Sequence, residues 1–146
     1  MSIDLAKNVF NCHHCNWSGN IDGWKMDREK FEKPKRTGWS KLGDAAAQFL
    51  KSRGFSLSTI EKNKLIQKSF GGNEMVGYPY FLPEETEPVN IKWRGVKDKS
   101  FGQEKNAFRV LYGIQNWVGC DELIFVEGEN DVLALNECGF WNATTL

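Results

Sequence analysis

The chain has 146 residues, enough for one domain with a hydrophobic core and a small appendage. With 40% hydrophobic and 26% charged residues, its composition is that of an ordinary globular protein. No apolar run approaches the roughly 20 residues of a membrane-spanning helix, and the first residues lack secretory or transit character. Four cysteines are too few and too irregularly spaced for a secreted disulfide framework, which favours a reducing compartment.

The net charge is zero, but the charges are distributed unevenly along the chain. Residues 25–41 hold seven Lys or Arg against three Asp or Glu, and residues 90–109 hold six against two. Residues 110–146 hold six Asp or Glu and no Lys or Arg. Basic segments followed by an acidic end suit a protein that holds polyphosphate or nucleic acid beside a divalent cation. The alternative for each basic segment is an ordinary solvated surface.

The first 24 residues are aromatic and cysteine-bearing, and they are too few to bury a core. Cys12 and Cys15 form a C-x-x-C turn with Gly19 behind it, a pattern common in zinc ribbons. A structural zinc needs four ligands, and the eleven residues upstream contain no Cys or His. The alternative is therefore a reduced thiol pair without metal. Residues 25–43 are polar and are typical of a linker.

A hairpin of two helices is predicted next. Residues 44–53 favour a helix that begins near Asp44 and is closed by Gly54 in a left-handed conformation. A second helix is expected to begin at Ser58, because Ser58 and Glu61 have the spacing of a capping box. We expect this hairpin to be a structural element without chemistry of its own.

Residues 75–82 and 89–94 are strand-like, and we expect residues 109–112 to add a third short strand. In the second run Lys92 and Arg94 fall on one face, where basic side chains beside a metal site bind nucleotide phosphates. Trp93 between them is expected to pack in the core rather than to stack on a base. The alternative for the whole stretch is an edge strand protected by its charges.

A β-α-β unit is predicted at the end of the chain. Residues 123–126 are a continuous apolar run, which indicates a strand buried on both faces. Residues 130–138 favour a helix that ends at Gly139, and residues 141–146 begin the next strand. This order implies parallel pairing, and function in such sheets lies at the carboxyl ends of the strands.

Two acidic residues follow the apolar run. Glu127 leaves the end of the strand, and Asp131 lies four residues later in the first turn of the helix, on the same face. Carboxylate oxygens are the ligands that Mg²⁺ prefers, and Gly128 between them permits close approach of a substrate. The alternative is that Glu129 and Asp131 are helix-start residues favoured by the helix dipole.

Residues 123–134, Leu-Ile-Phe-Val-Glu-Gly-Glu-Asn-Asp-Val-Leu-Ala, resemble the start of the TOPRIM domain of primases and of type II and IA topoisomerases. The order of half a zinc knuckle, a linker, an Arg-Gly-x-Ser-x-x-Thr hairpin, a basic strand and the acidic turn is similar to that of bacteriophage-type, Twinkle-like primase–helicases, particularly the plant organellar branch. The resemblance implies a mixed α/β chain. Its expected parts are a partial zinc ribbon (1–24), a linker (25–43), a primase N-terminal subdomain (44–117) and the start of a TOPRIM domain (118–146).

The function that this resemblance implies is that of a DNA primase, which joins ribonucleotides into a primer on single-stranded DNA with Mg²⁺ or Mn²⁺. The implied partners are single-stranded DNA, ribonucleotides and a full-length primase–helicase, and the implied location is a mitochondrion or plastid. The resemblance also implies roles for individual residues: Glu127 and Asp131 as catalytic and metal-binding residues, Lys92, Arg94, Lys97 and Lys99 as nucleotide or DNA contacts, and Cys12 and Cys15 as half of a Zn²⁺ site.

The sequence departs from the family pattern at both ends, and we therefore expect a truncated relative. No Asp-x-Asp follows Asp131, no cysteine pair precedes Cys12, and no G-x-x-x-x-G-K-[ST] helicase motif occurs. Zinc would bind only if the missing ligand pair were supplied. Whether the chain is an enzyme stays open. The alternatives are a catalytically incomplete relative that binds nucleic acid or regulates a partner, and another TOPRIM protein such as a topoisomerase or nuclease.

Overall fold

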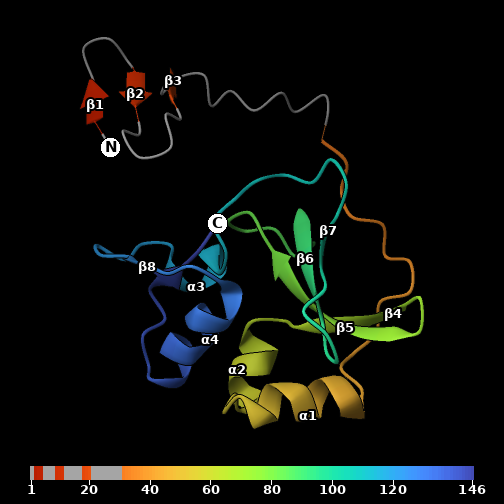
Figure 1. Ribbon diagram of the computed structural model, residues 1–146. Coiled ribbons are helices and arrows are strands. Elements are labelled where there is room, and N and C mark those ends of the chain that lie inside the picture. The colour runs from red at the N-terminus through yellow and green to blue at the C-terminus, as the bar shows by residue number, and fades with distance from the viewer. Residues whose placement is uncertain (1, 5–8, 12–17, 21–30) are drawn as a thin grey trace. The chain divides into compact units, whose positions relative to one another are not determined.

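The computed structural model describes residues 2–4, 9–11, 18–20 and 31–146 (Figure 1). The chain divides into two compact units, Met1–Phe31 and Glu32–Leu146. In the first unit the described residues form an antiparallel sheet of three strands: β1 (Ser2–Asp4), β2 (Val9–Asn11) and β3 (Ser18–Asn20). Cys12 and Cys15, the expected half of a zinc site, lie outside the described residues.

The second unit begins with the predicted helical hairpin, α1 (Asp44–Ser52) and α2 (Leu57–Lys62). Gly54 has φ +88° just beyond α1, as expected for a left-handed closing residue. The prediction that α2 begins at a Ser58 cap is wrong. Ser56, which has an extended backbone, accepts the Thr59 N–H at 3.2 Å through Oγ, and Ser58 lies inside the first turn.

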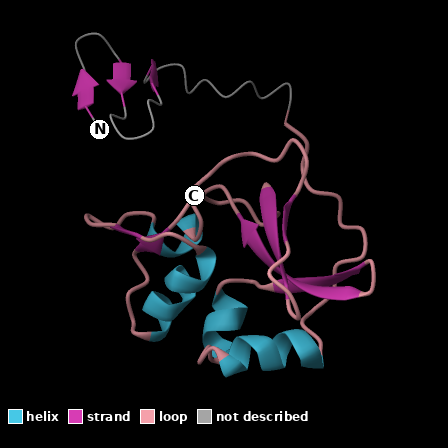
Figure 2. Cartoon of the chain, in the orientation of Figure 1, coloured by secondary structure: helices cyan, strands magenta, loops and turns pink. Residues whose placement is uncertain are grey.

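An antiparallel sheet of four strands follows the hairpin (Figure 2). Its strands, in the spatial order β4-β5-β6-β7, are β4 (Ile66–Phe70), β5 (Asn73–Tyr80), β6 (Asn90–Gly95) and β7 (Phe101–Gln103). β5 and β6 match the two predicted strands within two residues. The prediction of a strand at 109–112 is wrong, because this segment has no regular strand pairing. Among the described residues, Tyr112 alone ties it to other segments by hydrogen bonds, by donating its N–H to the Thr145 carbonyl and by accepting from Thr144 and Trp117 through its own carbonyl.

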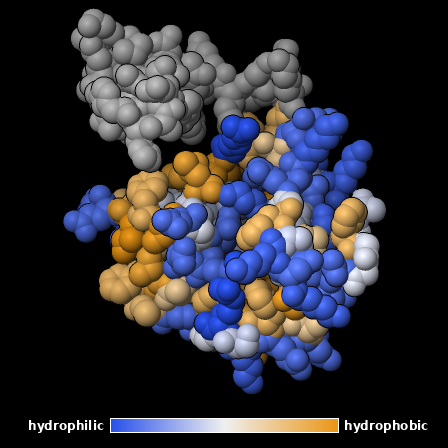
Figure 3. Space-filling view, viewed as in Figure 1, coloured by the Kyte–Doolittle hydropathy of each residue, from blue (hydrophilic) through white to orange (hydrophobic). Residues whose placement is uncertain are grey.

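The chain ends with α3 (Ile114–Trp117), β8 (Ile124–Phe125), α4 (Glu129–Glu137) and β9 (Ala143–Thr144). β8 pairs with β9 in parallel, which confirms the predicted β-α-β order. The expectation that the first strand is buried on both faces is wrong, since Phe125 is 64% exposed. Apolar side chains gather where α3 and β8 lie (Figure 3), and Val118 and Phe125 are exposed there.

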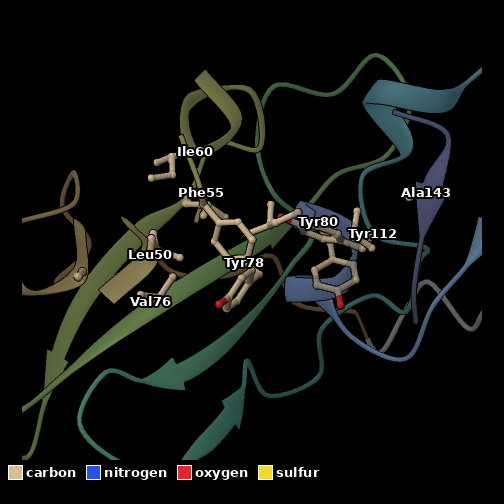
Figure 4. Packing of buried hydrophobic residues seen from close by; sticks show 12 residues of the cluster. Leu50, Phe55, Ile60, Val76, Tyr78, Tyr80, Tyr112 and Ala143 are labelled. Atoms are coloured by element: carbon tan, nitrogen blue, oxygen red, sulfur yellow. The ribbon is translucent and has the colours of Figure 1, made fainter. Parts of the chain in front are cut away.

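One hydrophobic core joins the helical hairpin, β5, α4 and β9 of the second unit (Figure 4). Leu50 of α1, Ile60 of α2, Tyr78 of β5, Leu133 of α4 and Ala143 of β9 belong to the same buried cluster. A smaller cluster of Met75, Ile91 and Trp93, with Trp39 and Ile66 packed against it, covers the other face of the sheet. The start of α4 is therefore fixed relative to β5 and β6. Every described helix is too short or too polar to traverse a bilayer.

Candidate functional site

A cleft of about 600 Å³ lies between the β6–β7 part of the sheet and the N-terminus of α4. It is lined by residues from five segments of the chain. These are Arg53 after α1, Tyr78 of β5, Lys92, Trp93, Arg94, Phe101, Gly102 and Gln103 of β6 and β7, and residues 127–131 at the start of α4. The cleft thus brings Glu127 and Asp131 together with Lys92 and Arg94.

The acidic turn carries two exposed carboxylates with different surroundings. Asp131 accepts the Gly128 N–H at 3.1 Å through Oδ2, so it caps α4 as the helix-start alternative expected. Glu127 lies at the end of β8, is exposed, and makes no hydrogen bond or ion pair with any described residue. Asp131 is partly engaged by the backbone, whereas Glu127 is available to a ligand.

Glu129 points to the sheet and links the acidic turn to the basic strand. Its Oε1 lies 3.0 Å from Lys92 Nζ and accepts the Tyr80 hydroxyl at 2.5 Å. The Glu129 side chain is 17% exposed and that of Lys92 is 29% exposed, so the pair is largely shielded from water. Sequence reasoning assigned Glu129 no role beyond the helix start, because this contact joins residues 37 positions apart and leaves no local signal.

The two basic residues of β6 share one face of the strand, as the alternation predicted. Lys92 is paired with Glu129, whereas Arg94 has no carboxylate partner among the described residues. The Arg94 guanidinium lies 5.9 Å from the Phe49 ring and 5.4 Å from the Phe101 ring, and its Nε is buried without a hydrogen-bond partner. A part-buried guanidinium without an acid beside it offers its donors to an incoming anion.

The other basic residues proposed for this strand lie elsewhere. Lys97 and Lys99 are exposed in the turn between β6 and β7 and do not line the cleft. Arg53, which the sequence did not single out, lines the cleft instead, with its guanidinium 5.3 Å from the Phe49 ring. Trp93 is 2% exposed and donates its indole N–H to Glu104 at 2.6 Å, which confirms its interpretation as a core residue.

Three tyrosines pack beneath the acidic turn, two of them from β5. Tyr78 donates its hydroxyl to Asn130 Oδ1 at 2.8 Å, and Tyr80 and Tyr112 pack edge to face with centroids 5.0 Å apart. Burial is the main cause that raises the pKa of all three hydroxyls above the ordinary tyrosine value, and the Glu129 carboxylate raises it further. The tyrosines therefore stay protonated, and the Tyr78 and Tyr80 hydroxyls hold the turn in place as hydrogen-bond donors to Asn130 and Glu129. The buried Tyr112 hydroxyl has no hydrogen-bond partner within the described part of the chain, and Tyr112 supports the turn by ring packing.

The acidic turn offers oxygen ligands for a metal ion. Within the described ranges, no three His, Cys, Asp or Glu side chains are grouped as a metal site. Glu127 and the remaining oxygen of Asp131 are a smaller set of hard donors. Mg²⁺ is commonly held by one or two carboxylates together with water and substrate phosphates. The donor chemistry of Glu127 and Asp131 fits Mg²⁺ or Mn²⁺.

Two known plant proteins are similar in sequence to most of this chain. It is 30% identical over 153 residues to the Twinkle homolog protein, chloroplastic/mitochondrial, of Arabidopsis thaliana, a match that covers 98% of the chain. It is 34% identical over 105 residues to the Primase homolog protein of the same plant, covering 72% of the chain. The chain is a homologue of these Twinkle-like and primase-like proteins. It spans 21% and 30% of the lengths of these two relatives, and no protein-family model matches it.

Solved primase structures share the fold of this Twinkle-like chain. The primase fragment of the bacteriophage T7 primase-helicase aligns with a TM-score of 0.55 and 21% identity, over 97% of this chain and 60% of that one. The E. coli primase catalytic core aligns with a TM-score of 0.57 and 19% identity, over 69% of this chain and 47% of that one. The mixed α/β architecture expected from the sequence is thereby confirmed.

Proposed function

We propose that this chain is part of a DNA primase and that its cleft binds the triphosphate of a nucleotide beside a divalent metal ion. The observation that carries the proposal is that Glu127 and Arg94 line the same cleft, each without a partner of opposite charge among the described residues. A carboxylate that can bind metal and a cation that can bind phosphate are both needed to hold a metal–triphosphate complex.

The residue roles follow from this arrangement. Glu127 and Asp131 hold Mg²⁺ or Mn²⁺, which supplies charge stabilisation during transfer of the nucleotide. Arg94, Lys92 and Arg53 contact the phosphates, and Lys97 and Lys99 contact nucleic acid outside the cleft. In this proposal residues 44–117 form the primase N-terminal subdomain and residues 118–146 open a TOPRIM domain. The preceding segments are a zinc ribbon (1–24), in which Cys12 and Cys15 supply half of a zinc site, and a linker (25–43).

The test is primer synthesis on single-stranded DNA with ribonucleotides and Mg²⁺, together with a binding assay for a fluorescent nucleoside triphosphate. Glu127→Gln should lower the synthesis rate by about 100-fold or more, because it removes a metal ligand without changing the shape of the side chain. Arg94→Gln should weaken triphosphate binding about tenfold. Lys51→Gln on α1, an equal charge change away from the cleft, should alter neither. Unchanged nucleotide binding in Arg94→Gln would refute the assignment.

A second candidate is a relative that binds nucleic acid without catalysis. The described residues contain only two available carboxylates at the cleft, and this observation favours it. Salt-sensitive binding of single-stranded DNA without any primer product would establish it in place of the enzyme. Relaxation of supercoiled DNA or DNA cleavage would instead establish a topoisomerase or nuclease. We further propose a mitochondrial or plastid location, because the Twinkle homolog is described as chloroplastic/mitochondrial. A full-length primase–helicase is the proposed partner, because the similar bacteriophage T7 fragment is part of a primase-helicase.

A further inference from the structure

A second hollow, of about 390 Å³, lies on the face of the sheet that points away from the cleft. Tyr78 lines the cleft, and Pro79, the next residue of β5, lines the second hollow. Successive residues of a strand point to opposite faces, so the sheet separates the two sites. The hollow and the cleft have no lining residue in common.

The lining of this hollow combines apolar walls with basic side chains. Ile66, Pro79, Phe81 and Pro88 supply the apolar surface, Ser40 and Thr86 supply hydroxyls, and Arg36, Lys41 and Lys64 supply positive charge. No acidic residue is among the lining residues. The nearby acids of the loop before β6 are occupied, since Glu87 binds Arg36 and Glu85 binds Lys33 at 3.0 Å. The free charge of the hollow is therefore positive.

Two lysines and one indole ring remain available in the hollow. Lys41 and Lys64 are exposed and have no ion-pair partner in the part of the chain that the structure describes. Lys64 Nζ lies 4.5 Å from the centre of the Phe81 ring, which holds the ammonium at the rim. Trp39 is only partly buried, and its ring is fixed by Trp93 at a centroid distance of 6.3 Å. Trp39 thus presents part of an aromatic surface in the hollow that the two unpaired lysines also line.

We propose that this hollow binds a nucleotide unit of a single-stranded nucleic acid, with a base against Trp39 and backbone phosphates at Lys41 and Lys64. Stacking on an aromatic ring beside phosphate-binding cations is the usual way in which proteins hold single strands. A proline-rich peptide could pack on the aromatic and proline surface, but it would not supply negative charge to Lys41 and Lys64. The identity of the nucleic acid as a primase template rests on the proposed function.

The test measures binding of the 146-residue chain to a fluorescent single-stranded oligodeoxynucleotide in EDTA, where metal-dependent binding at the cleft is absent. The double variant Lys41→Gln/Lys64→Gln should bind about tenfold more weakly. Its plot of log affinity against log salt should be shallower by about 1.4, the value for two lost phosphate contacts on a single strand. The matched pair Lys51→Gln/Lys105→Gln, which changes the same charge outside both hollows, should bind like the unchanged protein.

Substitution of the indole separates stacking from charge. Trp39→Phe should keep most of the affinity, and Trp39→Leu should lose about tenfold with no change in salt dependence. An equal loss in the Lys51/Lys105 pair would overturn the proposal, because binding would then follow net charge alone. Competition by a mononucleotide at the same concentration as the oligonucleotide would also overturn it in favour of a free-nucleotide site.

The outcome is separable from that of the proposed function. If Glu127→Gln has no effect because no primer is made, a loss of binding in Lys41→Gln/Lys64→Gln still supports the second site. If primer synthesis depends on Glu127 but oligonucleotide binding is unchanged in both the lysine and the Trp39 variants, the second site is refuted and the primase proposal stands.

Discussion

The ion pair between Glu129 and Lys92 should contribute measurably to stability, because both side chains are largely removed from water. Glu129→Gln keeps an oxygen that can accept the Tyr80 hydroxyl and removes the charge that binds Lys92. Hydrogen bonds to charged groups contribute about 1.5–3 kcal/mol when shielded, and exposed pairs less than about 1 kcal/mol. With exposed fractions of 17% and 29%, we expect Glu129→Gln to lower the free energy of unfolding by about 1–2 kcal/mol.

A double-mutant cycle with Lys92→Met isolates the pair. Urea unfolding followed by circular dichroism should give a coupling energy of about 1–1.5 kcal/mol between the two positions. The matched control is the exposed pair of Lys33 and Glu85, with side chains 56% and 37% exposed, for which about 0.5 kcal/mol or less is expected. A Glu129–Lys92 coupling below about 0.3 kcal/mol, or one no larger than the control, would refute the claim that Glu129 fixes the acidic turn to the sheet.

Three further predictions concern the core and its edges. Asn136→Ala should cost about 1–3 kcal/mol in urea unfolding, because the buried Asn63 amide donates to the Asn136 side-chain oxygen at 3.0 Å and would keep only its bond to the Thr59 carbonyl. Tyrosinate absorbance should appear only as the protein unfolds in alkali: burial raises the pKa of all three tyrosines, so the stability that they contribute is full below pH about 10 and falls above it. Hydrogen bonds from Thr59 and Ser56 lower the pKa of Glu137, so its contribution is present above pH about 4.3 and lost as pH falls through the lowered pKa. Glu137→Gln should therefore destabilise slightly at neutral pH and not at all in strong acid, and an equal effect at both pH values would contradict this reasoning.

Local patterns predicted most of the fold because they depend on neighbouring residues. Gly54 and Gly139, both with positive φ, closed helices where the sequence placed them. β4 was missed because Gln67, Lys68 and Ser69 interrupt its apolar pattern, and it is held as a strand by pairing with β5. Phe125 was expected to be buried because the run around it is apolar, yet burial depends on which segment packs against that face, and this is not a local property.

Only the site residues that a local sequence pattern marks could be predicted. Glu127 and Asp131 could be found from their spacing, and Lys92 and Arg94 from strand alternation. Arg53 and Glu129 could not be found in this way. Arg53 reaches the cleft only because the helical hairpin packs on the sheet. Glu129 acquires its role from Tyr80 and Lys92, which lie far away in sequence. Such contacts appear only once the core has assembled.

The helix α4 carries both the acidic turn and core residues. The number of residues in segment 127–131 is therefore more tightly constrained than the identity of those residues. Val132 and Leu133 are buried directly after Asp131, in the first turns of α4. One residue inserted between Gly128 and Val132 would rotate the following helix by about 100°, since an α-helix has about 3.6 residues per turn. The buried pair would then turn toward solvent while the carboxylates moved off the cleft. Substitutions in residues 127–131 are therefore compatible with folding, whereas insertions and deletions there disrupt the core and the site together.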